Sequence, residues 1–98
     1  MIRMRNLIPP GEILLEEFLR PMKISQNKLA MDIRVPTPQI NAIVNGKRAI
    51  TADTALRLGR YFGTGPEFWI KLQNNYDLCI SANHLKDELA VINQLTLA

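Results

Sequence analysis

The chain has 98 residues, of which 47% are hydrophobic and 21% are charged, and its formal net charge is +3. This length and composition fit one compact domain with its own core, and the longest apolar runs are far too short to span a membrane. The single cysteine and single histidine exclude an internal disulfide and a metal cluster of useful ligand spacing. We therefore expect a cytoplasmic protein without metal or cofactor.

The first eight residues are expected to form an N-terminal arm, because Pro9-Pro10-Gly11 breaks any earlier structure. This arm contains two arginines, Arg3 and Arg5, but no long apolar stretch follows them, so the sequence does not predict a signal peptide. A helix is predicted over residues 12–22, and Pro21 is expected to end it. Its inward face is apolar, consisting of Ile13, Leu14, Leu15, Phe18, Leu19 and Met22.

Residues 25–46, SQNKLAMDIRVPTPQINAIVNG, predict two short helices joined by a sharp bend. Ser25 can cap the first helix, over 25–33, through its side-chain oxygen. Pro36 and Pro38 prevent a continuous helix across the bend, because each ring fixes φ and lacks an N–H. The inward residues of the first helix are Leu29, Ala30 and Ile33.

A second helix is predicted over 37–45, with Thr37 as its N-cap and Pro38 in the first helical position. Asn45-Gly46 ends it. Its inward residues, which recur at helical spacing, are Ile40, Ile43 and Val44.

The outward residues of these two helices are short polar side chains and cations, which suit base edges and phosphates. The pattern therefore favours a DNA-reading helix-turn-helix over a pair of ordinary core helices. The residues expected to contact bases are Thr37, Pro38, Gln39, Asn41 and Ala42. The residues expected to contact phosphates are Gln26, Asn45, Lys47 and Arg48.

Basic residues concentrate in the same part of the chain. Residues 20–60 contain eight basic and two acidic residues, a net of +6, whereas the rest holds four basic and seven acidic residues, a net of −3. A strongly positive middle is the electrostatic footprint of a surface that binds a polyanion. Charge alone also fits an ordinary solvated surface, so the prediction depends on its coincidence with the two-helix motif.

Two more helices follow the motif. Thr51 opens the first of them, in which Arg57 and Arg60 face outward. Gly65-Pro66 starts the second. Its aromatic and apolar residues recur at helical spacing and are expected in the core rather than in a ligand site, namely Phe68, Trp69, Leu72, Tyr76 and Cys79.

Residues 81–98 predict an additional amphipathic helix, with an apolar side that continues to Leu95. This side either docks on the chain's own core or is buried against a second subunit or another protein. The residues expected at a dimer or partner contact are Trp69, Leu85, Leu89 and Ile92.

An enzyme is not expected. A hydrolase could use, for instance, Cys79 and His84, which lie five residues apart on one helix and its exit. They lack an orienting acid at a recognisable spacing and a glycine-rich oxyanion loop.

Two long segments, PPGEILLEEFLRPMKISQNKLA and INAIVNGKRAITADTALRLGRYFGTGPEFWIKLQNNYDL, closely resemble the HigA-type antitoxins, a branch of the repressor-like helix-turn-helix proteins. The resemblance spans residues 9–78. It implies a five-helix repressor-like domain over 9–80, which together with the helix predicted over 81–98 makes an all-α fold. It also implies a homodimer that binds operator DNA, represses its own operon and neutralises a cognate HigB-type toxin that cleaves mRNA. The alternative is a stand-alone transcriptional regulator without a toxin partner.

Some positions depart from the pattern of these proteins. Arg34 occupies the corner between the motif helices, where a glycine is common, so a left-handed non-glycine residue with a cost on the order of 1 kcal/mol is expected there. Gly65 stands at the start of the helix that begins with Gly65-Pro66, where these proteins usually have a serine as the N-cap. Pro38 and Ala42 stand where many repressors have polar base-reading residues, which leaves apolar contact with thymine methyl groups to Ala42.

Overall fold

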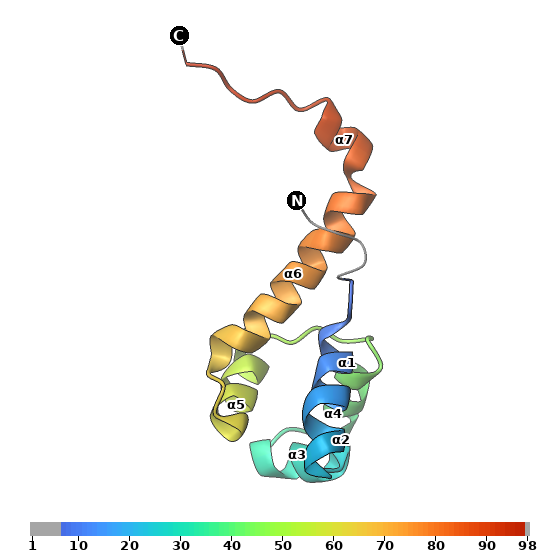
Figure 1. Ribbon diagram of the computed structural model, residues 1–98, viewed down its shortest axis with the longest axis vertical. Helices are drawn as coiled ribbons and strands as arrows, with labels where there is room; N and C mark the ends of the chain where they lie inside the picture. The colour runs from blue at the N-terminus through green and yellow to red at the C-terminus, as the bar shows by residue number, and fades with distance from the viewer. Residues whose placement is uncertain (1–6, 98) are drawn as a thin grey trace.

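A computed structural model of the chain describes residues 7–97, and all regular structure within this range is helical (Figure 1). The expected all-α fold is confirmed. Residues 1–6 of the predicted arm lie outside the described residues. The elements in chain order are α1 (Pro10–Ile13), η2 (Leu14–Leu19), α2 (Arg20–Met22), α3 (Gln26–Ile33), α4 (Thr37–Val44), α5 (Ala52–Phe62), α6 (Pro66–His84) and α7 (Lys86–Ala90).

The first three elements form one continuous helix, in which the π-helical segment η2 joins α1 to α2. This helix begins at Pro10, two residues before the predicted start. Pro21 lies inside its last turn and does not end it, which corrects the prediction. The wider π turn before Pro21 relaxes the backbone geometry that a proline ring would otherwise obstruct. The helix ends at Met22, and Lys23 follows in the left-handed conformation with φ at 56°.

Side chains from η2, α3, α4, α5 and α6 meet in one hydrophobic core. Full burial of a large apolar side chain contributes about 1.5–3 kcal/mol, so the core supplies the main driving force for packing the motif helices. Its buried members are Leu14, Leu19, Leu29, Ala30, Ile33, Ile40, Ile43, Ile50, Ala55, Leu58 and Trp69.

Two glycines let helices approach more closely than any side chain would allow. A Cβ atom on Gly11 would lie 1.8 Å from the carbonyl oxygen of Ile43, so the first helix packs directly on the backbone of α4. A Cβ atom on Gly59 would lie 2.4 Å from the carbonyl carbon of Gly65, so α5 packs directly on the residue before α6. These contacts fix α4 within the helical body.

The helix α6 extends beyond the core, and the chain after it leaves the body of the molecule (Figure 1). The predicted division at residue 80 falls inside α6, which continues to His84. The predicted C-terminal helix is too long, because α7 ends at Ala90 and residues 92–97 have no regular structure. A short helix is marginal when nothing covers its apolar side. None of the described helices has the length and apolar character needed to cross a bilayer.

Candidate nucleic-acid interface

The helix α3 is closed at both ends by local hydrogen bonds. The side-chain oxygen of Ser25 accepts a bond of 3.0 Å from the backbone N–H of Lys28, as expected for an N-cap. At the other end Arg34 has φ at 65°, so the expected left-handed corner is confirmed. The N–H of Val35 donates to the carbonyl of Ala30 at 2.9 Å, which completes a Schellman turn and redirects the chain towards α4.

The corner is also held from outside by Arg57 of α5. Its Nη1 donates to the carbonyl oxygens of Ile33 at 2.8 Å and of Arg34 at 3.3 Å. Its Nε donates to Asp53 at 2.6 Å, and these two side chains also form an ion pair one turn apart on α5. A cation at the C-terminal end of a helix is favourable, because the last carbonyl groups carry partial negative charge. Arg57 was expected to face solvent, and the structure instead uses it to tie α5 to the corner.

A second polar link joins α3 to α5. The hydroxyl of Tyr61 donates to Asp32 Oδ2 at 2.6 Å, and Lys28 Nζ lies 3.0 Å from the same oxygen. The hydrogen bond from Tyr61, together with that from Lys28, lowers the pKa of the Asp32 carboxyl below its ordinary value. The hydrogen bond to Asp32 raises the pKa of Tyr61, with burial as the next cause.

The helix α4 begins one residue earlier than the sequence indicated. Pro36 is its N-cap, and Thr37 is its first helical residue, so the assignment of Thr37 as a cap is wrong. Thr37 lies close to the start of α3, and its hydroxyl donates to Asn27 Oδ1 at 2.8 Å. The capping role is therefore replaced by a link between the two motif helices.

The residues predicted to contact bases are divided by the structure into two sets. Pro38 and Asn41 are exposed on α4, and Ala42 is half-buried. Thr37 and Gln39 are also half-buried, but both are already hydrogen-bonded within the protein. The Nε2 atom of Gln39 donates to Thr54 Oγ1 of α5 at 3.2 Å, so its amide group is turned towards the body.

The residues predicted to contact phosphates lie at the two ends of the motif. Gln26 is the first residue of α3 and is half-buried. Asn45 caps the C-terminal end of α4, and Lys47 and Arg48 follow in an exposed loop. No salt bridge within residues 7–97 involves either of these two cations.

The loop after α4 has a defined conformation. Gly46 is left-handed with φ at 75°, and the N–H of Lys47 donates to the carbonyl of Ala42 at 2.8 Å, which forms a second Schellman turn. Further on, the N–H of Ile50 donates to the buried side chain of Gln73 in α6 at 2.7 Å. These bonds hold Lys47 at the end of α4, beside the exposed face of that helix.

Several residues that position the motif could not be identified from the sequence. The bonds by which Asn27, Thr54 and Gln73 position the motif reach Thr37, Gln39 and Ile50, which lie at least 10 positions away in the chain, so no local pattern predicts these bonds. The sequence did contain a local signal for two pairs of opposite charge four residues apart on a helix, Asp53 with Arg57 and Lys28 with Asp32.

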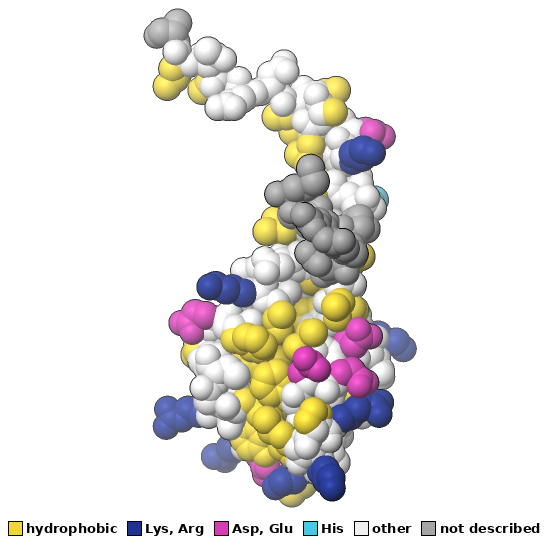
Figure 2. All heavy atoms as spheres, in the orientation of Figure 1, with side chains coloured by type: hydrophobic (Ala, Val, Ile, Leu, Met, Phe, Trp, Pro, Cys, Tyr) yellow, Lys and Arg dark blue, Asp and Glu magenta, His cyan; other side chains and the backbone are white. Residues whose placement is uncertain are grey.

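The residues predicted at a dimer or partner contact do not share one environment. Trp69 is fully buried, with its ring centroid 4.8 Å from that of Phe18, and its Nε1 donates to Thr64. It cannot take part in a partner contact, which corrects the prediction. Leu85, Leu89 and Ile92 are 42%, 49% and 67% exposed. They belong to the C-terminal extension, residues 85–97. Figure 2 shows hydrophobic side chains on this extension beside a few charged ones, and further Lys and Arg side chains around the globular end.

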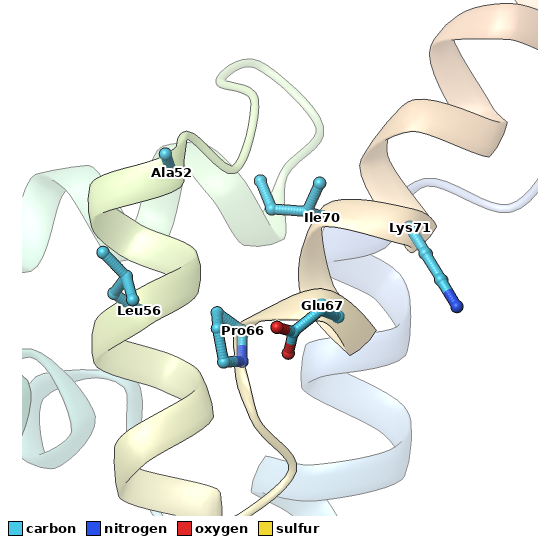
Figure 3. Close-up of a pocket in the computed structure, with 6 residues that line it drawn as sticks. All are labelled: Ala52, Leu56, Pro66, Glu67, Ile70 and Lys71. Carbon is cyan, nitrogen blue, oxygen red and sulfur yellow. The ribbon is translucent and has the colours of Figure 1, made fainter.

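An apolar groove lies between α5 and α6 (Figure 3). Leu56, Pro66 and Ile70 line it, and Glu67 and Lys71 are its charged residues. The lining holds no set of titratable groups suited to acid–base or nucleophilic chemistry.

The pair Cys79 and His84 is not an assembled catalytic site. Cys79 is 3% exposed, whereas His84 is exposed at the end of α6. Within residues 7–97 no Asp, Glu, His and Cys residues form a group of three that could hold a metal ion.

The sequence matches the family model described as helix-turn-helix over residues 15–69, more than half of the chain. It is 54% identical over 71 residues to virulence-associated protein I of Dichelobacter nodosus, covering 72% of this chain and 66% of that protein. It is 33% identical over 91 residues to antitoxin HigA-1 of Vibrio cholerae, covering 93% of this chain and 86% of that protein. A solved structure of Pseudomonas aeruginosa antitoxin HigA with the higBA promoter is 42% identical, with a TM-score of 0.87 over 92% of this chain and 99% of that chain.

Proposed function

This chain belongs to the helix-turn-helix family and, within it, to the HigA antitoxins, and on that premise we propose that it binds operator DNA, represses its own operon and neutralises a toxin. The observation that carries the DNA-binding part is the exposed face of α4, followed directly by the exposed cations Lys47 and Arg48. The similar P. aeruginosa antitoxin in complex with promoter DNA supports it. The function consists of binding alone, without a catalytic step.

Each subunit would insert α4 into a major groove, so that the exposed face of this helix meets base edges. Gln26 at the start of α3 would contact the phosphates on one side of the groove. Asn45, Lys47 and Arg48 after α4 would contact those on the other side. Phosphate contacts from both ends of the motif fix the register of α4 on the duplex.

A homodimer would supply two such helices. The exposed apolar side chains of the C-terminal extension, among them Leu85, Leu89 and Ile92, form a surface that a second copy of the chain can bury. A twofold dimer places its two reading helices about 34 Å apart, one turn of the duplex. The operator is therefore an inverted repeat with half-sites at this spacing or a multiple of it.

Fluorescence anisotropy tests the DNA-binding part. The titration compares a labelled duplex from the region upstream of the chain's own gene with a scrambled duplex of the same length and composition. Specific binding should be on the order of a thousandfold tighter or more, and equal affinity for the two duplexes would contradict a repressor.

The second partner would be a HigB-type toxin that cleaves mRNA, encoded beside this chain. The similarity to antitoxin HigA-1 over most of its length supports this part. The rival is a stand-alone regulator, which shares every DNA-facing feature. Size-exclusion chromatography with light scattering on the chain alone and co-expressed with the neighbouring gene product separates the two. A stable complex that protects cellular mRNA supports the antitoxin, and the lack of any complex favours the regulator.

A further inference from the structure

The exposed face of α4 presents one uncommitted amide group between two apolar side chains. Pro38, Asn41 and Ala42 fall within an arc of about 100° around the helix axis, given the rotation of about 100° per residue. Pro38 and Asn41 are exposed, and no hydrogen bond within the described residues engages the side chain of Asn41. We call Pro38, Asn41 and Ala42 the reading triad.

The other two polar residues of α4 are committed to the protein. The hydroxyl proton of Thr37 is donated to Asn27 of α3, and the amide nitrogen of Gln39 is donated to Thr54 of α5. Thr54 is 2% exposed, so its hydroxyl is a fixed anchor rather than a surface group. Because these two bonds run from α4 to two different helices, they fix the rotation of α4 about its own axis.

From this arrangement we propose that the chain selects operator half-sites with A·T pairs at their centre, Asn41 binding an adenine edge while Pro38 and Ala42 contact thymine methyl groups. The proposal rests on the DNA-binding function proposed above. An asparagine amide matches adenine, because its oxygen accepts from N6 and its nitrogen donates to N7. The C5-methyl of thymine is the apolar feature of a base pair in the major groove, and small apolar side chains complement it.

A G·C pair at the same positions would be disfavoured for a definite reason. Its major-groove edge lacks the methyl group that Pro38 and Ala42 would contact, and burying its polar groups against these side chains without a partner is costly. In this assignment Thr37 and Gln39 are positioning residues, which present the reading triad and contact no base themselves.

The experiment begins with selection from duplexes that carry randomised half-sites, followed by anisotropy titrations on the selected duplex. We expect A·T pairs at the centre of each half-site. Replacing each central thymine by deoxyuridine removes only its methyl group and should weaken binding several-fold. Replacing the contacted adenine by 7-deazaadenine should weaken wild-type binding on the order of tenfold and leave Asn41→Ala unaffected.

Asn75→Ala is the matched control, because Asn75 is an exposed asparagine on α6 and should retain the full response to 7-deazaadenine. Gln39→Ala removes a bond that fixes the rotation of α4, so it should lose thermal stability and weaken binding to every duplex, and it should still respond to 7-deazaadenine. A G·C-centred selected site, insensitivity to deoxyuridine, or an Asn41→Ala variant that still responds to 7-deazaadenine would each overturn the proposal. Failure to bind any duplex would instead overturn the proposed DNA-binding function.

Discussion

Arg57 of α5 donates a hydrogen bond of 2.8 Å to the carbonyl oxygen of Ile33, the last residue of α3. This bond joins the left-handed corner of the motif to a helix that carries none of the predicted DNA contacts. The angle between α3 and α4 therefore depends on α5 as well as on the corner residues themselves.

Arg57→Met should reduce the free energy of unfolding by about 1–2 kcal/mol, because it keeps the apolar stem but removes charge-assisted bonds to two carbonyl groups. A loss of this size lowers Tm by several degrees in a domain of this length. Thermal denaturation followed by circular dichroism measures it. Arg60→Met on the same helix is the control, since Arg60 is exposed, and its effect should stay within about 0.5 kcal/mol. Equal losses of stability in the two variants would show that Arg57 does not stabilise the corner.

Gly11→Ala should be more damaging than its small volume suggests. The added Cβ would lie 1.8 Å from the carbonyl oxygen of Ile43, and a backbone atom of α4 cannot move without shifting that helix. We expect a loss of about 1–3 kcal/mol or more in urea unfolding, together with weaker operator binding. The comparison is Gly46→Ala, where a Cβ meets nothing within 4 Å and only the strain of φ at 75° remains, on the order of 1 kcal/mol. If Gly46→Ala destabilises the protein more than Gly11→Ala does, the close packing of Gly11 on α4 does not control stability.

Lys47→Ala should weaken binding to specific and non-specific duplexes alike. Lys47 is exposed at the end of α4, and a phosphate contact from it would release about one counterion. The slope of log affinity against log salt concentration should fall by about 0.9 per subunit in anisotropy titrations. Lys86→Ala in α7 changes the net charge equally and should leave the slope unchanged. An unchanged slope in Lys47→Ala would exclude Lys47 from the phosphate contacts.

Asp32→Asn should lower the pKa of Tyr61 towards its ordinary value, because the hydrogen bond to the Asp32 carboxylate raises that pKa in the native protein. A pKa that is raised on folding stabilises the fold fully below the unfolded value near 10, and this contribution is lost as the pH rises through the folded value. Phenolate absorbance in a Tyr76→Phe background reports Tyr61 alone among the two tyrosines. Identical titration curves with and without Asp32→Asn would show that the bond is not populated in solution.

The double substitution Leu85→Ser and Leu89→Ser should convert a dimer into a monomer. Both leucines are exposed on the C-terminal extension, and a second copy is the proposed cover for them. Light scattering across a concentration series measures the mass, and operator affinity should fall with it. Met22→Ser is the control, because Met22 is an exposed apolar residue at the end of α2 and should leave the mass unchanged. A dimer that survives the double substitution would place the interface elsewhere.

Local signals in the sequence were sufficient to predict the helices of the motif. Ser25 and Thr51 cap their helices as expected, since a capping side chain needs only a backbone N–H three residues away. Arg34 is left-handed, as the resemblance implied from the glycine that is common at this corner. By contrast, the end of α6 was misplaced by several residues. The apolar spacing continues through residue 80 without a strong breaking signal, so periodicity alone does not locate the junction with α7.

The sequence by itself determined the class of this protein: an all-helical domain with a basic helix-turn-helix, whose apolar periods, caps and charge partition act over a few residues. The tertiary structure decided which polar residues remain available to a partner. Gln39 carries the same amide group as Asn41, and Thr37 carries a hydroxyl, but only packing brings Thr54 and Asn27 within hydrogen-bond distance of them. Trp69 likewise became a core residue because the first helix and α5 close over it. Hydrogen bonds between distant residues form only when the chain is packed, so the face that we propose to read DNA is a property of the fold.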